Sequence, residues 1–160
     1  MATTLELTTE ARPECIRPLR NLVERLASDT GFSDEDAYAI KVCVSEALAN
    51  SVLHAYPTSA PGSVNVSLRE ERDELEVTVA DEGQGVYDMR NGEEDLHLGL
   101  LLITRLATHC TFTAAGDGTK VDMSFSRPQR KDEAFDSWPV RDPDALFRRG
   151  IPSASGRTVA

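Results

Sequence analysis

The stretch that decides the fold is SEALANSVLH, residues 45–54. In a helix, which turns about 100° per residue, Glu46, Asn50 and His54 fall within one narrow arc. Apolar residues flank this arc on both sides. A carboxylate or amide left unpaired between them would cost a few kcal/mol on burial, so we expect a polar partner or a ligand on this face.

A second stretch, VADEGQGV at residues 79–86, runs like a strand and then breaks at Asp81 and at the glycines Gly83 and Gly85. Glycine lets a backbone approach a neighbouring group closely, so the pattern predicts a loop that lies against something. Bland interpretations stay open for both stretches. The first is also compatible with a polar stripe at a helix–helix seam, and the second with a plain turn.

Length and composition bound the class of protein. The chain has 160 residues and a formal net charge of −10, which argues against a nucleic-acid binder because such proteins carry basic patches. Its three cysteines have no metal-like spacing and are expected to be free thiols. We see no secretory signal and no apolar run long enough for a membrane span, so the prediction is a cytoplasmic protein that does not contact a membrane.

Periodicity divides the chain into a domain over residues 1–127 and a tail over residues 128–160, for which we expect flexibility. Within the domain, alternating and helical patterns predict the order β-α-α-β-β-α-β-β. The expected strands are 4–8, 63–69, 75–80, 111–115 and 119–126, and the expected helices are 12–29, 33–56 and 98–109. Strands with one apolar face need helices on that face only, which predicts a two-layer α/β sandwich.

Four short motifs occur together in one order along the chain: Glu46-xxx-Asn50, Asp81-x-Gly83-x-Gly85, Gly99-Leu100 and Gly118-Thr119. They resemble the N box, the G1 box, a G2-like segment and the final threonine of the GHKL (Bergerat) ATP-binding fold. DNA gyrase, Hsp90, sensor histidine kinases and the anti-sigma factor serine kinases share that fold. Residues 45–56 and 79–83 look specifically like the last group, the RsbW and SpoIIAB type. The resemblance covers about residues 3–127 and implies an α+β fold with a mixed, mostly antiparallel sheet and helices on one face.

The resemblance also implies roles for individual residues on the helix. Asn50 would be the Mg²⁺ ligand, since a neutral oxygen donor suits this hard cation alongside phosphate oxygens and water. Glu46 would be the catalytic general base that accepts the proton of an attacking serine hydroxyl.

Other residues would surround the ATP base and phosphates. Asp81 would accept the adenine amino proton, and Thr119 would add a hydroxyl to the same side of the pocket. Gly83 and Gly85 would let the backbone pass under the base and sugar. Gly99 would stand where a helix presents its amide groups to the phosphates.

One segment departs from the family pattern. Where the family has a glycine-rich segment around the triphosphate, this chain reads EDLHLG at residues 94–99. Two acids and His97 replace glycines or small residues, although His97 could donate a hydrogen bond to a phosphate. The lid, residues 86–96, is short, and the nearest cationic side chains are Arg90 and Arg105.

The resemblance therefore implies an anti-sigma factor with ATP-dependent serine-protein kinase activity, acting in transcription regulation and stress response. Such a protein would hold a sigma factor inactive and phosphorylate an anti-anti-sigma (STAS-domain) partner, and it would be a homodimer. The altered segment favours an alternative, a non-catalytic sigma-binding or regulatory module of the same fold. A third possibility is the ATPase part of a histidine kinase, but the chain shows no phosphoacceptor helix.

Overall fold

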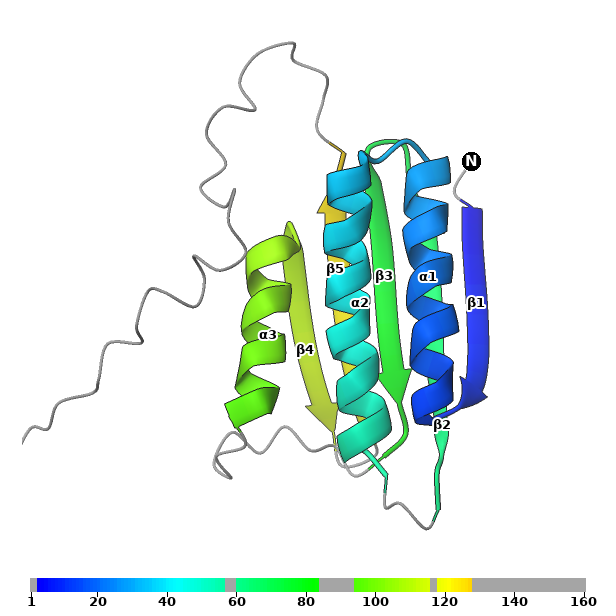
Figure 1. Cartoon of the computed structure of the whole chain (residues 1–160), viewed down its shortest axis with the longest axis vertical. Coiled ribbons are helices and arrows are strands. Elements are labelled where there is room, and N and C mark those ends of the chain that lie inside the picture. The colour runs from blue at the N-terminus through cyan, green and yellow to red at the C-terminus, as the bar shows by residue number, and fades with distance from the viewer. Residues whose placement is uncertain (1–2, 57–59, 84–93, 116–117, 128–160) are drawn as a thin grey trace, which may run out of the picture. The chain divides into compact units, whose positions relative to one another are not determined.

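The computed structural model describes residues 3–56, 60–83, 94–115 and 118–127. Within these described residues, five strands and three helices follow one another in the predicted order. Their bounds are β1 Thr3–Glu10, α1 Pro13–Asp29, α2 Asp34–His54, β2 Ser63–Glu70, β3 Glu74–Asp81, α3 Glu94–Leu106, β4 His109–Ala115 and β5 Gly118–Ser126. The helices lie together on one face of the sheet, with α2 between α1 and α3 (Figure 1). The predicted two-layer α+β sandwich is confirmed.

The strands form one sheet in the order β1-β2-β3-β5-β4, and every pairing in it is antiparallel. The expectation of a mixed sheet was therefore wrong. Helix α3 does connect two strands that run the same way, β3 and β4, as a crossover helix usually does. However, β5 turns back from β4 and lies between them, so the two parallel strands never pair.

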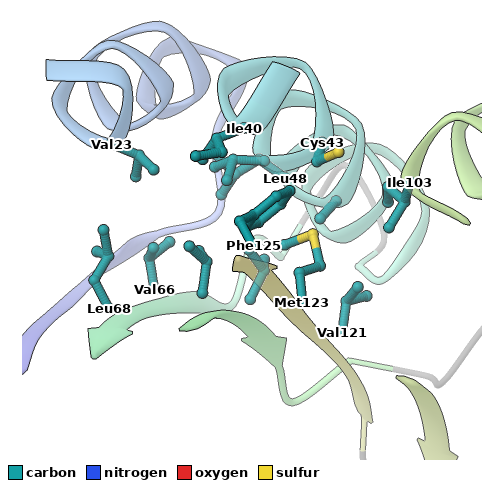
Figure 2. Packing of buried hydrophobic residues seen from close by; sticks show 14 of the residues in the cluster. Val23, Ile40, Cys43, Leu48, Val66, Leu68, Ile103, Val121, Met123 and Phe125 are labelled. Carbon is teal, nitrogen blue, oxygen red and sulfur yellow. The ribbon is translucent and has the colours of Figure 1, made fainter. Parts of the chain in front are cut away.

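The core lies between the sheet and α2, which carries buried residues around more than one face. The inward-facing apolar side chains of the three central strands pack beneath the helices (Figure 2). They alternate with mostly polar positions on the other face, as a half-buried sheet requires. These inward residues are Val64, Val66, Leu68, Leu75, Val77, Val79, Val121, Met123 and Phe125. Among the described helices, α2 has a helix on each side and the sheet beneath it, so its polar residues are held in fixed positions between these elements.

The local signals at the start of α2 behave as the sequence predicts. Gly31 has φ +97°, the left-handed conformation expected of a glycine that ends a helix. The Ser33 side chain then caps α2 by accepting a hydrogen bond of 3.1 Å from the backbone N–H of Asp36.

The third helix begins at Glu94 and ends at Leu106, whereas the sequence predicted residues 98–109. Acidic residues suit a first helical turn, so Glu94 and Asp95 extend the helix toward its N-terminus. At the other end, His109 belongs to β4, where Cys110 and Phe112 face the core in alternation. The apolar run alone marked the helix centre and not its ends.

Cys15, Cys43 and Cys110 are free thiols, as expected. Burial raises the pKa of Cys43 to about 12, so this thiol stays protonated and behaves as a small core residue. Burial also raises the pKa of Cys15 and of Cys110.

Among the described helices, none is both long and apolar enough to cross a membrane. Residues 128–160, the predicted tail, lie outside the described part of the chain, and the boundary at residue 127 stays a prediction.

Two leucines of α2 provide a matched test of this packing. Leu48 is fully buried and Leu53 is 59% exposed. We expect Leu48→Ala to lower the free energy of unfolding by about 2–5 kcal/mol, because it removes buried methyl groups and leaves a cavity. Leu53→Ala should change it by less than about 0.5 kcal/mol. Urea unfolding of both variants measures the difference, and equal effects would contradict the placement of α2.

Candidate functional site

The two stretches that the sequence singled out meet in the structure. The C-terminal end of α2 lies at the C-terminal end of β3, where the Ser51 hydroxyl donates a 2.7 Å hydrogen bond to Oδ2 of Asp81. Both side chains are buried. This bond joins two residues 30 positions apart in the chain. Ser51 lies beside the arc of Glu46, Asn50 and His54 for which the sequence predicted a polar partner or a ligand, and not on it.

Asp81 is the centre of the site. Its Oδ1 accepts hydrogen bonds from the backbone N–H of Gly83 at 3.1 Å and of Thr119 at 3.2 Å. The carboxylate is therefore tied to α2, to the loop after β3 and to the start of β5. An ionised carboxylate offers about four lone-pair positions, and these three hydrogen bonds leave one on Oδ2. Asp81 remains 7% exposed, so a ligand N–H could reach that position.

Two glycines allow the backbones around Asp81 to approach this closely. A Cβ on Gly83 would lie 2.3 Å from the carbonyl oxygen of Ala55, so the glycine loop rests directly on the end of α2. A Cβ on Gly118 would lie 2.0 Å from the carbonyl oxygen of Asp81, and Gly118 also has φ +131°. In both cases the tight approach is to the protein's own backbone, which brings three segments around one carboxylate.

Tyr56 also bonds to the loop that follows Asp81. Its hydroxyl accepts a 2.8 Å hydrogen bond from the backbone N–H of Glu82 and donates one of 2.6 Å to the carbonyl oxygen of Ser63. The segment after α2, the start of β2 and the glycine loop are thus joined at one oxygen. Sequence reasoning assigned no role to Tyr56 or Ser51, because their partners are distant in the chain.

Glu46 and Asn50 lie on α2, four residues apart and both partly buried. The amide nitrogen of Asn50 is buried without a hydrogen-bond partner in the described part of the chain. A buried N–H donor in that state is costly, which fits an amide that donates to a bound acceptor such as a phosphate oxygen, while its oxygen is the atom that a metal ion would bind. The described residues contain no group of three or more His, Cys, Asp or Glu side chains that could hold a metal ion. Mg²⁺ bound by one or two protein oxygens commonly completes its shell with water and phosphate oxygens.

Glu46 lies at the contact between α2 and α3. A Cβ on Gly99 of α3 would stand 2.7 Å from Oε2 of Glu46, so the glycine makes room for this carboxylate. Burial raises the pKa of Glu46 above its usual range. A carboxyl group with a raised pKa is a better proton acceptor near neutral pH, as a general base requires.

The structure thus brings Asp81, Gly83 and Thr119 together and places Glu46 beside Gly99. Gly85, Arg90 and most of the predicted lid lie outside the described residues. His97 falls within α3, where only its backbone is described. Arg105 is exposed in the last turn of α3.

A family model for the histidine kinase-like ATPase domain matches residues 9–125. The chain belongs to this family. Among its relatives, serine-protein kinase RsbW of Bacillus licheniformis is 36% identical over 90 residues, covering 55% of this chain and 56% of that protein. RsbW of Listeria monocytogenes serovar 1/2a is 34% identical over 116 residues, covering 64% of this chain and 74% of that protein. The predicted relationship to the RsbW type is confirmed.

Solved structures of this ATPase family share the fold. The RsbU and RsbW domains of a Mycobacterium tuberculosis protein match with a TM-score of 0.63 at 20% identity, over 78% of this chain and 32% of that one. The histidine kinase domain of a blue-light activated kinase from Erythrobacter litoralis matches with a TM-score of 0.53 at 23% identity, over 73% of this chain and 61% of that one. The chain spans a little over half the length of the Bacillus relatives it matches, 56% for the first of them.

Gly118 and Gly31 provide a test of the close approach at Asp81. Both have positive φ, but no heavy atom of the described structure lies within 4 Å of a Cβ placed on Gly31. We expect Gly31→Ala to cost about 1 kcal/mol of unfolding free energy from backbone strain alone. Gly118→Ala should cost at least about 3 kcal/mol, because the methyl group also collides with a backbone carbonyl. Chemical denaturation measures both variants, and equal losses would exclude the collision.

Glu46 predicts a pH-dependent stability. Because its pKa is raised in the folded protein, the folded state holds this proton more tightly than the unfolded chain does. Stability is therefore lost as the pH rises from the unfolded pKa through the folded one. Glu46→Gln should raise the free energy of unfolding at pH 7, and the gain should disappear below about pH 4, where glutamate in the unfolded chain is protonated as well. Thermal melts across this range test the prediction, and a gain that does not depend on pH would contradict it.

Proposed function

We propose that this chain binds ATP with Mg²⁺ between the end of α2 and the loop after β3, and that it is an anti-sigma factor with serine-protein kinase activity. The observation that carries the proposal is the buried Asp81 carboxylate, which is fixed by three hydrogen bonds and retains one acceptor position. That arrangement suits the amino group of adenine, whereas the carbonyl oxygen of guanine would be repelled. RsbW relatives named as serine-protein kinases support the proposed reaction class.

In this proposal each predicted site residue has one task. Asp81 accepts the adenine amino proton, and Thr119, Gly83 and Gly85 line the base and sugar. Asn50 is the Mg²⁺ ligand. Helix α3 begins at Glu94, so its free backbone amides, which we propose as phosphate contacts, belong to residues 94–97 and include that of His97. Gly99 follows this turn and leaves room for the Glu46 carboxylate.

ATP supplies the phosphoryl group when bound. Glu46 accepts the proton of the incoming serine hydroxyl, and its raised pKa suits that task. The serine oxygen then forms the new bond to phosphorus as the bond to ADP breaks. The acceptor that we propose is an anti-anti-sigma protein with a STAS domain, and the sequestered partner is a sigma factor. We also propose that the chain acts in the cytoplasm as a homodimer, in a stress response.

A second candidate, a sigma-binding module without kinase activity, is favoured by one observation. Residues 94–97, which correspond to the family's glycine-rich phosphate segment, are part of α3 and include two acidic residues. Carboxylates near a triphosphate repel it, and a helix cannot wrap around phosphates as a glycine loop does.

Titration with ATP in the presence and absence of Mg²⁺ tests the nucleotide site. Asn50→Ala should weaken ATP binding in Mg²⁺ by at least about tenfold, and it should remove the dependence on the metal. The matched control is Asn65→Ala on the far face of the sheet, where the Asn65 amide bonds to Thr8 at 2.9 Å. That variant should bind like the parent protein, and binding that is indifferent to Mg²⁺ and to Asn50 would overturn the site.

Label transfer from ATP to a purified STAS-domain partner separates the two candidate functions. For the kinase, we expect transfer that falls by at least about a hundredfold in Glu46→Gln, while ATP affinity changes little. Sigma-factor binding without transfer in the parent protein would instead support the non-catalytic module.

A further inference from the structure

Ser51 is a buried hydroxyl in the last turns of α2, with 4% of its surface exposed. A serine in a helix often returns its hydrogen bond to the helix backbone. Ser51 instead donates its hydrogen across the core to Oδ2 of Asp81, at 2.7 Å. This bond joins the helix that carries Asn50 to the strand that ends at Asp81.

The bond changes what the Asp81 carboxylate can do. The terminal torsion of an aspartate is broad, and the two backbone donors from Gly83 and Thr119 both reach Oδ1. Ser51 is the described group that holds the other oxygen. With the Ser51 bond in place, both carboxylate oxygens are fixed, and the remaining lone pair of Oδ2 points in one direction.

Ser51 also fixes the hydrogen-bonding character of this end of the site. A hydroxyl has one hydrogen to donate, and Asp81 receives it. What remains at Ser51 Oγ and Asp81 Oδ2 is therefore acceptor capacity only. A ligand group that carries N–H hydrogens is matched there, whereas a carbonyl oxygen meets lone pairs.

We propose that Ser51 is a positioning residue that sets base selectivity, by holding Asp81 so that it accepts from the exocyclic amino group of a purine. This inference rests on the proposed binding of ATP and goes beyond it, because it assigns selectivity to a residue that need not touch the base.

The test compares three nucleotides on the folded 160-residue chain: ATP, purine riboside triphosphate, which lacks the amino group, and GTP. The parent protein should prefer ATP to both. In Ser51→Ala the affinity for ATP should fall by about three- to tenfold, because the acceptor is no longer held. Purine riboside triphosphate cannot use that acceptor, so its affinity should change less and the preference for ATP should narrow. Ser51→Thr keeps the hydroxyl and should retain the preference.

A matched control is available on the same strand. Thr78 in β3 donates a 2.7 Å hydrogen bond to Asp122 in β5 on the sheet face away from the helices. Thr78→Val removes a hydroxyl–carboxylate bond of equal length and should leave all three affinities unchanged. If Ser51→Ala does not fold, Ser51→Cys keeps the size of the side chain with a weaker donor and should show the same narrowing.

The outcomes separate the two proposals. An unchanged ratio between the affinities for ATP and purine riboside triphosphate in folded Ser51→Ala or Ser51→Cys would overturn the role of Ser51 and leave the ATP site standing. A parent protein that binds none of the three nucleotides would overturn the proposed function and this inference with it.

Discussion

The structure depends on one buried carboxylate. Asp81 ends a central strand, and its three hydrogen bonds come from a helix, a loop and the neighbouring strand. Charged groups are buried only at a cost unless such donors compensate them, so the segments that supply the donors are constrained together. The glycines at 83 and 118 follow from this constraint, because any side chain there would keep the backbones apart.

Helix α2 connects Asp81 to the other proposed site residues, because it carries Ser51, Asn50 and Glu46. It packs against the sheet and between the two other helices, and most of its buried residues are apolar. Glu46, Asn50 and Ser51 therefore share one rigid element. At about 1.5 Å of rise per residue, the proposed proton acceptor and the residue that positions Asp81 are separated by roughly 7.5 Å along the axis. The distance between the proposed base pocket at Asp81 and the proposed proton acceptor Glu46 is thus set by helix α2 and not by loops.

The order and type of the strands and helices could be predicted from the sequence, because they depend on local periodicity. Alternation defined the strands. The spacing of apolar residues defined the first helix, a capping signal opened the second, and an apolar run marked the third. The failures concern long-range effects. A helix crossover correctly indicated two strands of like direction, but only tertiary pairing shows that β5 lies between them. Ser51 and Tyr56 look unremarkable locally, and their importance comes from partners on β3 and beyond it. The glycine spacing marked the loop correctly, yet the contact that demands Gly83 is with Ala55 of the same chain.

Two polar side chains on α2, Glu46 and Asn50, lower the stability of the folded state. Burial disfavours the charged form of Glu46, and the amide nitrogen of Asn50 is buried without a partner among the described residues. A sequence selected for stability alone would place apolar residues at both positions, since their neighbours on the helix are Ala47, Leu48 and similar side chains. Costs of this kind persist at functional sites, where a ligand supplies the missing interactions. Asp81 is the contrast: its three hydrogen bonds stabilise the arrangement that its neighbours on α2 need, and one acceptor position remains for what binds there.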